Sequence, residues 1–268
     1  MSRPGDVDVT SAARRAGDHP IVEKGARLGY AMSGLLHLLI GWIALKLAWG
    51  IDGGPEDADS SGALATVANT STGPLLLWMT VVGLGFLALW QLTEAVIGRH
   101  GAELADRAKA LGKTVLYAVL AFSAFRVTQR AGGSSEESTQ SLTAQVMEAP
   151  GGRVLIGLVG LGIIAGGGYH VWKGWTCGFL DDLAGHPGRA VEVAGRAGYV
   201  AKGVALVVVG ALFVTAALAS EASEAGGLDA ALKTVRDQPF GPALLTVVAV
   251  GIAAYGIYSF GRARHARL

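Results

Sequence analysis

The sequence predicts an all-α integral membrane protein: three parallel two-helix repeats forming a pseudo-threefold bundle of six transmembrane helices, with short amphipathic helices on the outer side. Two observations carry this prediction. The chain of 268 residues is 51% hydrophobic and only 16% charged, with 40 glycines, which is too apolar for an ordinary soluble domain. A helical hairpin also occurs three times, and such self-similarity indicates one supersecondary unit used repeatedly.

Long runs without charged residues mark the transmembrane segments. Five runs are long enough for a helix that crosses a hydrocarbon layer of about 30 Å. They cover residues 28–45, 60–93, 154–172, 203–220 and 238–261. A sixth, weaker segment covers residues 108–129, where Lys109, Lys113 and Arg126 lie near the ends and can extend to the interface. The runs lack the alternation of a β-barrel, so we expect helices.

Two copies of the repeat are similar residue by residue. The segment GARLGYAMSGLLHLLIG at residues 25–41 returns as GRAGYVAKGVALVVVG at residues 195–210. The segment TVANTSTGPLLL at residues 66–77 returns as TVRDQPFGPALL at residues 234–245. A middle copy, residues 108–174, is more diverged. Each copy holds two spans, so successive copies enter the membrane in the same direction and are related by an axis along its normal.

The spans and loops divide the chain into three repeats and two tails. We expect a disordered cytoplasmic tail at residues 1–20, repeats at 21–98, 104–178 and 192–262, and a basic cytoplasmic tail at 263–268. The expected spans cover about residues 26–49, 74–97, 108–129, 152–174, 197–220 and 242–262.

A short amphipathic pattern occurs in each outer loop, at residues 62–68, 141–147 and 228–235, before a Gly-Pro or Gly-Gly step. We expect interfacial helices that cap the hairpins. The alternative is a re-entrant gate or a substrate lid.

The distribution of basic residues predicts the orientation. The two tails and the loops on one side hold 16 of the 22 Lys and Arg residues, against four in the loops on the other side. By the positive-inside rule the basic side faces the cytoplasm, so we expect both termini there and the protein in the cell (inner or plasma) membrane. Residues 1–20 lack an apolar core, so we expect no cleavable signal peptide.

Glycine spacing predicts where helices pack closely. Gly34 and Gly41 are seven residues apart, as are their equivalents Gly203 and Gly210, so each pair shares one helix face. In the fourth span, the glycines at positions 162, 166, 167 and 168 indicate close packing or, in a transporter, a hinge.

The ends of the second helices carry the most informative polar residues. Shifts of 79 and 168 residues superpose three sets of positions: Trp90, Tyr169 and Tyr258; Gln91, His170 and Ser259; and Glu94, Lys173 and Arg262. The last position is acidic once and basic twice. If the repeat axis brings these ends together, we expect Glu94 to pair with Lys173 or Arg262. The alternative is that each of these side chains extends separately to water at the interface.

Two histidines lie within the expected spans. His37 is near the middle of the first span, where an unpaired imidazole would cost free energy, and His170 is nearer the cytoplasmic end of the fourth. His37 is a candidate proton relay, haem or metal ligand, or neutral imidazole bonded to a neighbouring helix. A two-histidine haem site would need ligands at different depths, so we expect no cofactor. The single Cys177 excludes an intramolecular disulfide framework and a Cys-based metal cluster.

Several of these features resemble an uncharacterised bacterial membrane family, domain of unknown function 1206. They are the three-copy hairpin, the R-x-G-Y motif at residues 27–30 and 196–199, and the short outer helix followed by Gly-Pro. The resemblance covers residues 22–262 and implies three tandem two-helix units, but no known activity or site residues. In the middle copy Ala110 and Lys113 stand at the positions of the motif's Arg and Tyr, a departure from strict threefold symmetry.

Three classes of function follow from these features. No catalytic motif occurs in a suitable context, so we expect a protein that is not an enzyme. A membrane scaffold or assembly factor is the first expectation, and it predicts a tight bundle. The alternative, a small-solute or ion transporter, predicts a water-filled axial cavity that reaches His37, Gln91 or Glu94. A haem-binding redox subunit is the third. A net charge of +1 argues against nucleic acid, so the expected partners are the lipid bilayer and other membrane proteins.

Overall fold

The computed structural model describes residues 20–51, 58–97, 104–129 and 135–267. Within these ranges six helices are long and apolar enough to span a membrane. They are α2 (Pro20–Trp49), α4 (Gly73–Ile97), α5 (Leu104–Thr128), α7 (Gly152–Trp175), α8 (Arg189–Ala219) and α10 (Gly241–His265). The shorter elements are α3 (Ser60–Ala68), α6 (Ser135–Glu148), η1 (Gly178–Asp182), η2 (Ala222–Glu224) and α9 (Leu228–Arg236). The chain is an all-helical, multi-pass membrane protein.

The helices extend beyond the apolar segments that predicted them. α2 begins at Pro20 and α8 at Arg189, whereas the apolar pattern predicted starts near residues 26 and 197. The added polar turn of α2 is stabilised locally by an ion pair of 2.9 Å between Arg27 and Glu23, four residues apart. α10 likewise continues through part of the expected basic tail to His265. Apart from Pro20, the tail expected at residues 1–20 lies outside the described residues.

The outer loops contain the three expected short helices, and two of these pack into the protein core. Asp59 caps α3 by accepting hydrogen bonds from the backbone N–H groups of Ser61 (2.7 Å) and Gly62 (3.1 Å). Leu64 of α3 and Leu232 of α9 are fully buried in the largest hydrophobic cluster. These two helices therefore close the outer end of the bundle and do not lie on its surface.

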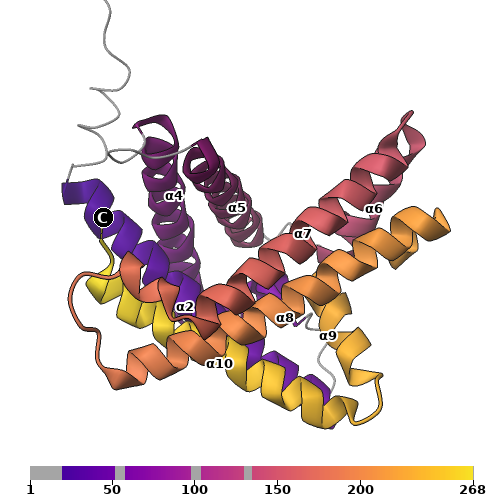
Figure 1. The fold of residues 1–268 in the computed structure, drawn as a ribbon. Helices are drawn as coiled ribbons and strands as arrows, with labels where there is room; N and C mark the ends of the chain where they lie inside the picture. Colours follow the sequence, from indigo (N-terminus) through magenta and orange to yellow (C-terminus); the bar gives the residue numbers. More distant parts are fainter. Residues whose placement is uncertain (1–19, 52–57, 98–103, 130–134, 268) are drawn as a thin grey trace, which may run out of the picture.

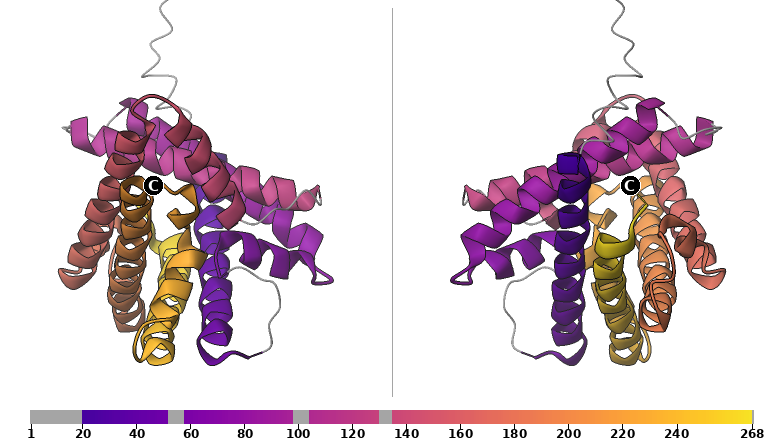
Figure 2. Two further views of the ribbon diagram at one scale, coloured as in Figure 1. Left: turned by 90° about the vertical axis from the view of Figure 1, so that its right-hand side faces the viewer. Right: turned by 90° about the vertical axis from the view of Figure 1, so that its left-hand side faces the viewer.

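The six long helices pack as three pairs: α2 with α10, α4 with α5, and α7 with α8 (Figure 1). Each pair joins the first helix of one repeat to the second helix of the preceding repeat, with repeat 3 preceding repeat 1. The pairing is therefore cyclic, and its contacts run between repeats. Seen from the sides, α4 and α5 extend across the direction of α2 and α10 (Figure 2).

Glycines hold two of these pairs together at the predicted positions. A Cβ on Gly203 would lie 2.6 Å from the backbone oxygen of Gly167, and one on Gly34 would lie 2.9 Å from that of Gly256. Gly210 and Gly41 make the corresponding contacts one heptad further along, with Gly160 and Ala249. The predicted role of Gly34, Gly41, Gly203 and Gly210 in helix packing is therefore confirmed.

In α7 the packing glycines differ from those expected. Gly160 and Gly167 contact α8, whereas a Cβ on the glycines at positions 162, 166 and 168 would meet no atom within 4 Å. The prediction of a packing pair at Gly162 and Gly166 was wrong, because these residues point away from the only long helix that α7 contacts closely among the described elements.

Contacts within a repeat form in repeats 1 and 3 but not in repeat 2. α2 packs against α4, and α8 against α10, whereas α5 and α7 have no comparable contact in the described part of the chain. In repeat 1 the contact brings Gly29 against the backbone of Gly83. Their equivalents in repeat 2, Gly112 and Gly162, would each accept a Cβ without meeting any atom. The cyclic bundle is therefore open on one side, between α5 and α7.

Candidate functional site

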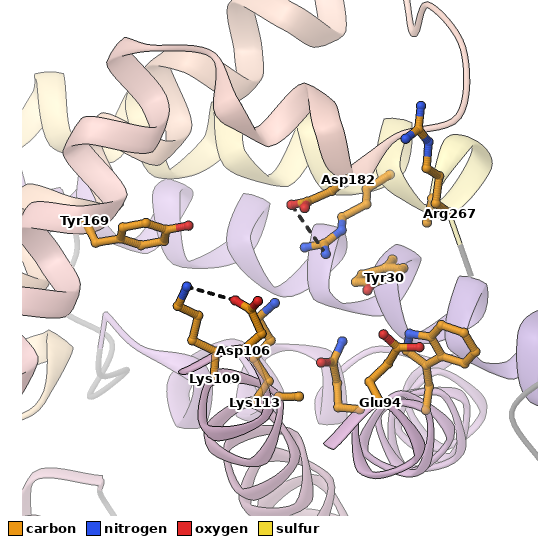
Figure 3. A pocket seen from close by; sticks show the side chains of 13 residues that line it. Tyr30, Glu94, Asp106, Lys109, Lys113, Tyr169, Asp182 and Arg267 are labelled. Atoms are coloured by element: carbon orange, nitrogen blue, oxygen red, sulfur yellow. Dashed lines mark hydrogen bonds and ion pairs between the residues drawn. The ribbon is translucent and has the colours of Figure 1, made fainter. Parts of the chain in front are cut away.

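A polar pocket of about 240 Å³ lies at the end of the bundle next to this open side. It is bordered by the last turns of α4, α7 and α10, the first turns of α5, and Tyr30 of α2. Its charged residues are Lys109, Lys113, Arg262, Arg267, Glu94, Asp106 and Asp182. Figure 3 shows Asp106, Lys109 and Lys113 on one side of the pocket and Asp182 on the opposite side. The pocket thus collects charges from α4, α5, η1 and the end of α10.

The repeat explains the positions of three charged residues of the pocket, Arg262, Glu94 and Lys113, in the helix pairs. In the α2–α10 pair, the guanidinium of Arg262 lies 4.4 Å from the ring centre of Tyr30. In the α7–α8 pair, the equivalent Lys173 lies 5.7 Å from the ring of Tyr199. In the α4–α5 pair the same two positions hold Glu94 and Lys113, and both line the pocket. The departure of the middle copy from the R-x-G-Y motif therefore turns an aromatic position into a basic one.

Asp182 is the acidic partner of the basic residues at the ends of α7 and α10. Its carboxylate lies 2.8 Å from Nζ of Lys173 and 3.9 Å from the guanidinium of Arg262. Burial raises the pKa of the Asp182 carboxyl, but the positive charges of Arg262 and Lys173 outweigh burial and hold its pKa below the usual value. Asp182 is therefore an anion that neutralises part of the positive charge at this end of the bundle.

The expected pairing of Glu94 with Lys173 or Arg262 was wrong. Both basic residues pair with Asp182, and none of the ion pairs between described residues joins either one to Glu94. The sequence did not single out Asp182 because it lies in η1, beyond the ends of the aligned helices. The available signal was the adjacent acidic residues Asp181 and Asp182 in the segment 173–202, whose other charged residues are mostly basic.

Aromatic packing and backbone contacts fix η1 and the end of α10 in place. Phe179 of η1 is fully buried, with its ring centre 5.2 Å from that of Tyr199 and 5.1 Å from that of Tyr258. The backbone N–H of Arg267 donates to the carbonyl oxygen of Asp182 at 3.1 Å. These contacts orient the Asp182 carboxylate toward α10.

Arg27, from the R-x-G-Y motif, caps α10. Its guanidinium donates hydrogen bonds to the carbonyl oxygens of Ala263 (3.1 Å) and Arg264 (2.8 Å). Carbonyl groups at a helix C-terminus have no partner within the helix, so a cation there satisfies them and complements the helix dipole. The motif therefore positions the turn that carries Arg262.

His37 lies outside the pocket and has partners at both ring nitrogens. Nδ1 lies 2.7 Å from the carbonyl oxygen of Ser33, and Nε2 lies 3.3 Å from Nζ of Lys202. An ammonium group can only donate, so these contacts fit a neutral imidazole that donates from Nδ1 and accepts at Nε2. Of the roles predicted for His37, this arrangement corresponds to a neutral imidazole bonded to a neighbouring helix.

The other predicted residues divide between the pocket and its surroundings. Gln91 is buried and lines the pocket beside Glu94. His170 does not line it; its Nδ1 lies 2.8 Å from the carbonyl oxygen of Gly166, and its ring stacks on Tyr199. Across the described ranges, no group of three or more His, Cys, Asp or Glu residues is placed to hold a metal ion.

Comparison with protein families gives three matches along the chain. The matching family model is described as "Domain of Unknown Function (DUF1206)", and it covers residues 28–98, 108–177 and 197–266. The chain belongs to the DUF1206 family. Each DUF1206 match contains one two-helix repeat, so the family unit is the hairpin itself.

A curated relative of unknown function aligns with nearly the whole chain. The chain is 29% identical over 252 residues to the "Uncharacterized protein YxxB" of Bacillus subtilis (strain 168). The alignment covers 90% of this chain and 90% of the relative. No solved structure matches the chain. Membership of the DUF1206 family thus supports the repeat architecture. The function has to be inferred from the candidate site.

Proposed function

We propose that the protein is a membrane carrier for an anionic molecule, which binds in the pocket between α4, α5, α7 and α10. The pocket itself is the observation that carries this proposal. A transporter was expected to have a water-filled axial cavity reaching His37, Gln91 or Glu94. Two of these three residues, Gln91 and Glu94, line the pocket at one end of the bundle. A scaffold was expected to be a tight bundle, which fits the open side between α5 and α7 less well.

The charges of the pocket favour an anion. Four basic and three acidic residues line it. Each of the three acidic residues has an interaction partner: Asp182 pairs with Lys173 and Arg262, Asp106 pairs with Lys109 at 3.2 Å, and Glu94 is engaged as well. Lys113 takes part in none of the ion pairs between described residues. A cation held near a low-dielectric region without a counter-ion attracts an anion strongly.

The open side supports a carrier with two states. A carrier must expose and then cover its site. Gly112 and Gly162 occupy the positions at which Gly29 and Gly83 bring α2 against α4 in repeat 1. Docking α5 on α7 through these glycines would complete the cyclic bundle and cover the pocket. Such a carrier needs no catalytic step and no cofactor.

We further propose that the pocket faces the cytoplasm of a cell (inner or plasma) membrane, with both termini on the same side. The basic residues gather at the end of the bundle that holds the pocket, as the positive-inside rule requires.

Inorganic phosphate should stabilise the purified full-length protein. A ligand that binds only the folded state raises the free energy of unfolding by about 2.7 kcal/mol at 100 times its dissociation constant. We expect phosphate to raise the thermal unfolding temperature in detergent at constant ionic strength. Lys113→Gln should weaken this effect, with an apparent affinity about tenfold lower, because it removes one charge-assisted hydrogen bond.

Lys24→Gln is the matched control, since Lys24 is exposed at the same end of the bundle but does not line the pocket. It should respond to phosphate as the unmodified protein does. An equal response of Lys113→Gln would contradict anion binding in the pocket. An equal effect of chloride would contradict selective binding of phosphate.

A further inference from the structure

We propose that the bound anion is the headgroup of an anionic phospholipid, which enters the pocket from the bilayer between α5 and α7. This inference rests on the proposed function and specifies its substrate class. Three features carry it: the lateral opening, the unused donors of the pocket, and an uncovered face of α7 that leads from the pocket into the membrane.

The opening connects the pocket to the hydrocarbon. α5 and α7 both border the pocket, but they do not pack against each other as the equivalent helices of repeats 1 and 3 do. α5 is the least covered span: 6% of its apolar segment is buried inside the protein, against 50% for α10. Large apolar side chains such as Val115 and Leu116 are exposed along it. A molecule in the bilayer can therefore reach the pocket from the side.

The unused donors match a phosphodiester. Among the described atoms, none accepts a hydrogen bond from the buried Nε of Arg262. Lys113 is exposed and forms no ion pair with a described residue. A phosphate group offers several acceptor oxygens and pairs well with both guanidinium and ammonium groups. A zwitterionic headgroup would add a positive charge next to Lys109 and Lys113, so the pocket should prefer an anionic headgroup.

One face of α7 offers room for an acyl chain. Gly162, Gly166 and Tyr169 are spaced by four and three residues, so they lie on the same face of the helix. Tyr169 lines the pocket, and a Cβ on either glycine would meet no atom within 4 Å. These glycines do not hold a neighbouring helix. They leave a smooth apolar surface that continues from the pocket along the span.

The test is lipid retention by the full-length protein. The protein is reconstituted in vesicles of equal parts phosphatidylglycerol and phosphatidylcholine with the same acyl chains, and native mass spectrometry identifies the lipid retained after release. We expect phosphatidylglycerol to be retained at least about tenfold more than phosphatidylcholine, as expected for one charge-assisted contact. Lys113→Gln and Gly166→Leu should each remove most of this preference.

The controls separate the site from general lipid contact. Lys24→Gln removes an exposed charge outside the pocket, and Gly168→Leu adds a side chain to an open position on another face of α7. Both should keep the preference. Equal retention of the two lipids, or an unchanged preference in Lys113→Gln and Gly166→Leu, would overturn the lipid inference. Stabilisation by free phosphate without lipid preference would overturn it and leave the anion carrier intact, whereas loss of both responses would overturn both proposals.

Discussion

Replacing Gly203 with leucine should separate α7 from α8 and cost about 3 kcal/mol or more of stability, the upper part of the range for overpacking. A Cβ at this position would lie 2.6 Å from the backbone oxygen of Gly167. Backbone atoms cannot move aside as a flexible side chain can, so the two helices must move apart and lose their contacts along several turns. Thermal unfolding in detergent measures the loss.

Gly168→Leu is the matched control, because it makes the same change at a position where a Cβ meets nothing. It removes a glycine from a helix, so its stability should equal or slightly exceed that of the unmodified protein. Equal unfolding temperatures for the Gly203 and Gly168 variants would contradict the packing of α7 on α8.

Asp182→Asn should destabilise the protein by about 3 kcal/mol, as expected when one partner of a largely buried ion pair is removed. The side chains of Lys173 and Arg262 are only 14% and 11% exposed, so the substitution leaves two cations close together with little access to water. Asp181→Asn, an exposed neighbour, should change the stability by less than about 0.5 kcal/mol. The double variant Asp182→Asn with Lys173→Met should be more stable than Asp182→Asn alone.

The pH dependence provides a second measure of the same interaction. The pKa of Asp182 lies below its usual value because the effect of Arg262 and Lys173 exceeds that of burial. A carboxyl whose pKa is depressed by folding contributes its full stability above the unfolded pKa of about 3.9 and loses it as the pH falls through the native pKa. The stability difference between the unmodified protein and Asp182→Asn should therefore be constant above about pH 4 and shrink below it. A constant difference at lower pH would contradict the ion pair.

The helices and the glycine contacts of repeats 1 and 3 could be predicted because they depend on local periodicity. A charge-free run of sufficient length determines a span, and a seven-residue spacing places Gly203 and Gly210 on one face. The spacing does not identify the neighbouring helix. Gly162 and Gly166 have an equally favourable spacing but face the open side, because the sequence of one helix carries no information on which helices surround it.

The site was predicted only in part for the same reason. Gln91 and Glu94 were found because equivalent positions of a repeat lie at the same depth. Asp182 was missed because its position depends on the burial of Phe179 against two tyrosines, a contact between distant segments. The pairing of helices from different repeats was not predicted either. The outer loops are long enough to contain a helix, so each span can pack against the other span of its own repeat or against a span of another repeat.

Chemical labelling of a cysteine in the pocket tests the anion carrier most directly. Ala110 lines the pocket on α5, and Cys177 is the single native cysteine, so Ala110→Cys is introduced with Cys177→Ser. The labelling rates of an anionic and a cationic methanethiosulfonate reagent of similar size are compared in inverted and right-side-out vesicles, each divided by its rate with a free thiol. We predict faster labelling by the anionic reagent, and only in inverted vesicles, because Lys109, Lys113 and Arg262 attract anions into a pocket that faces the cytoplasm. Faster labelling by the cationic reagent, or labelling from the outside alone, would contradict this account.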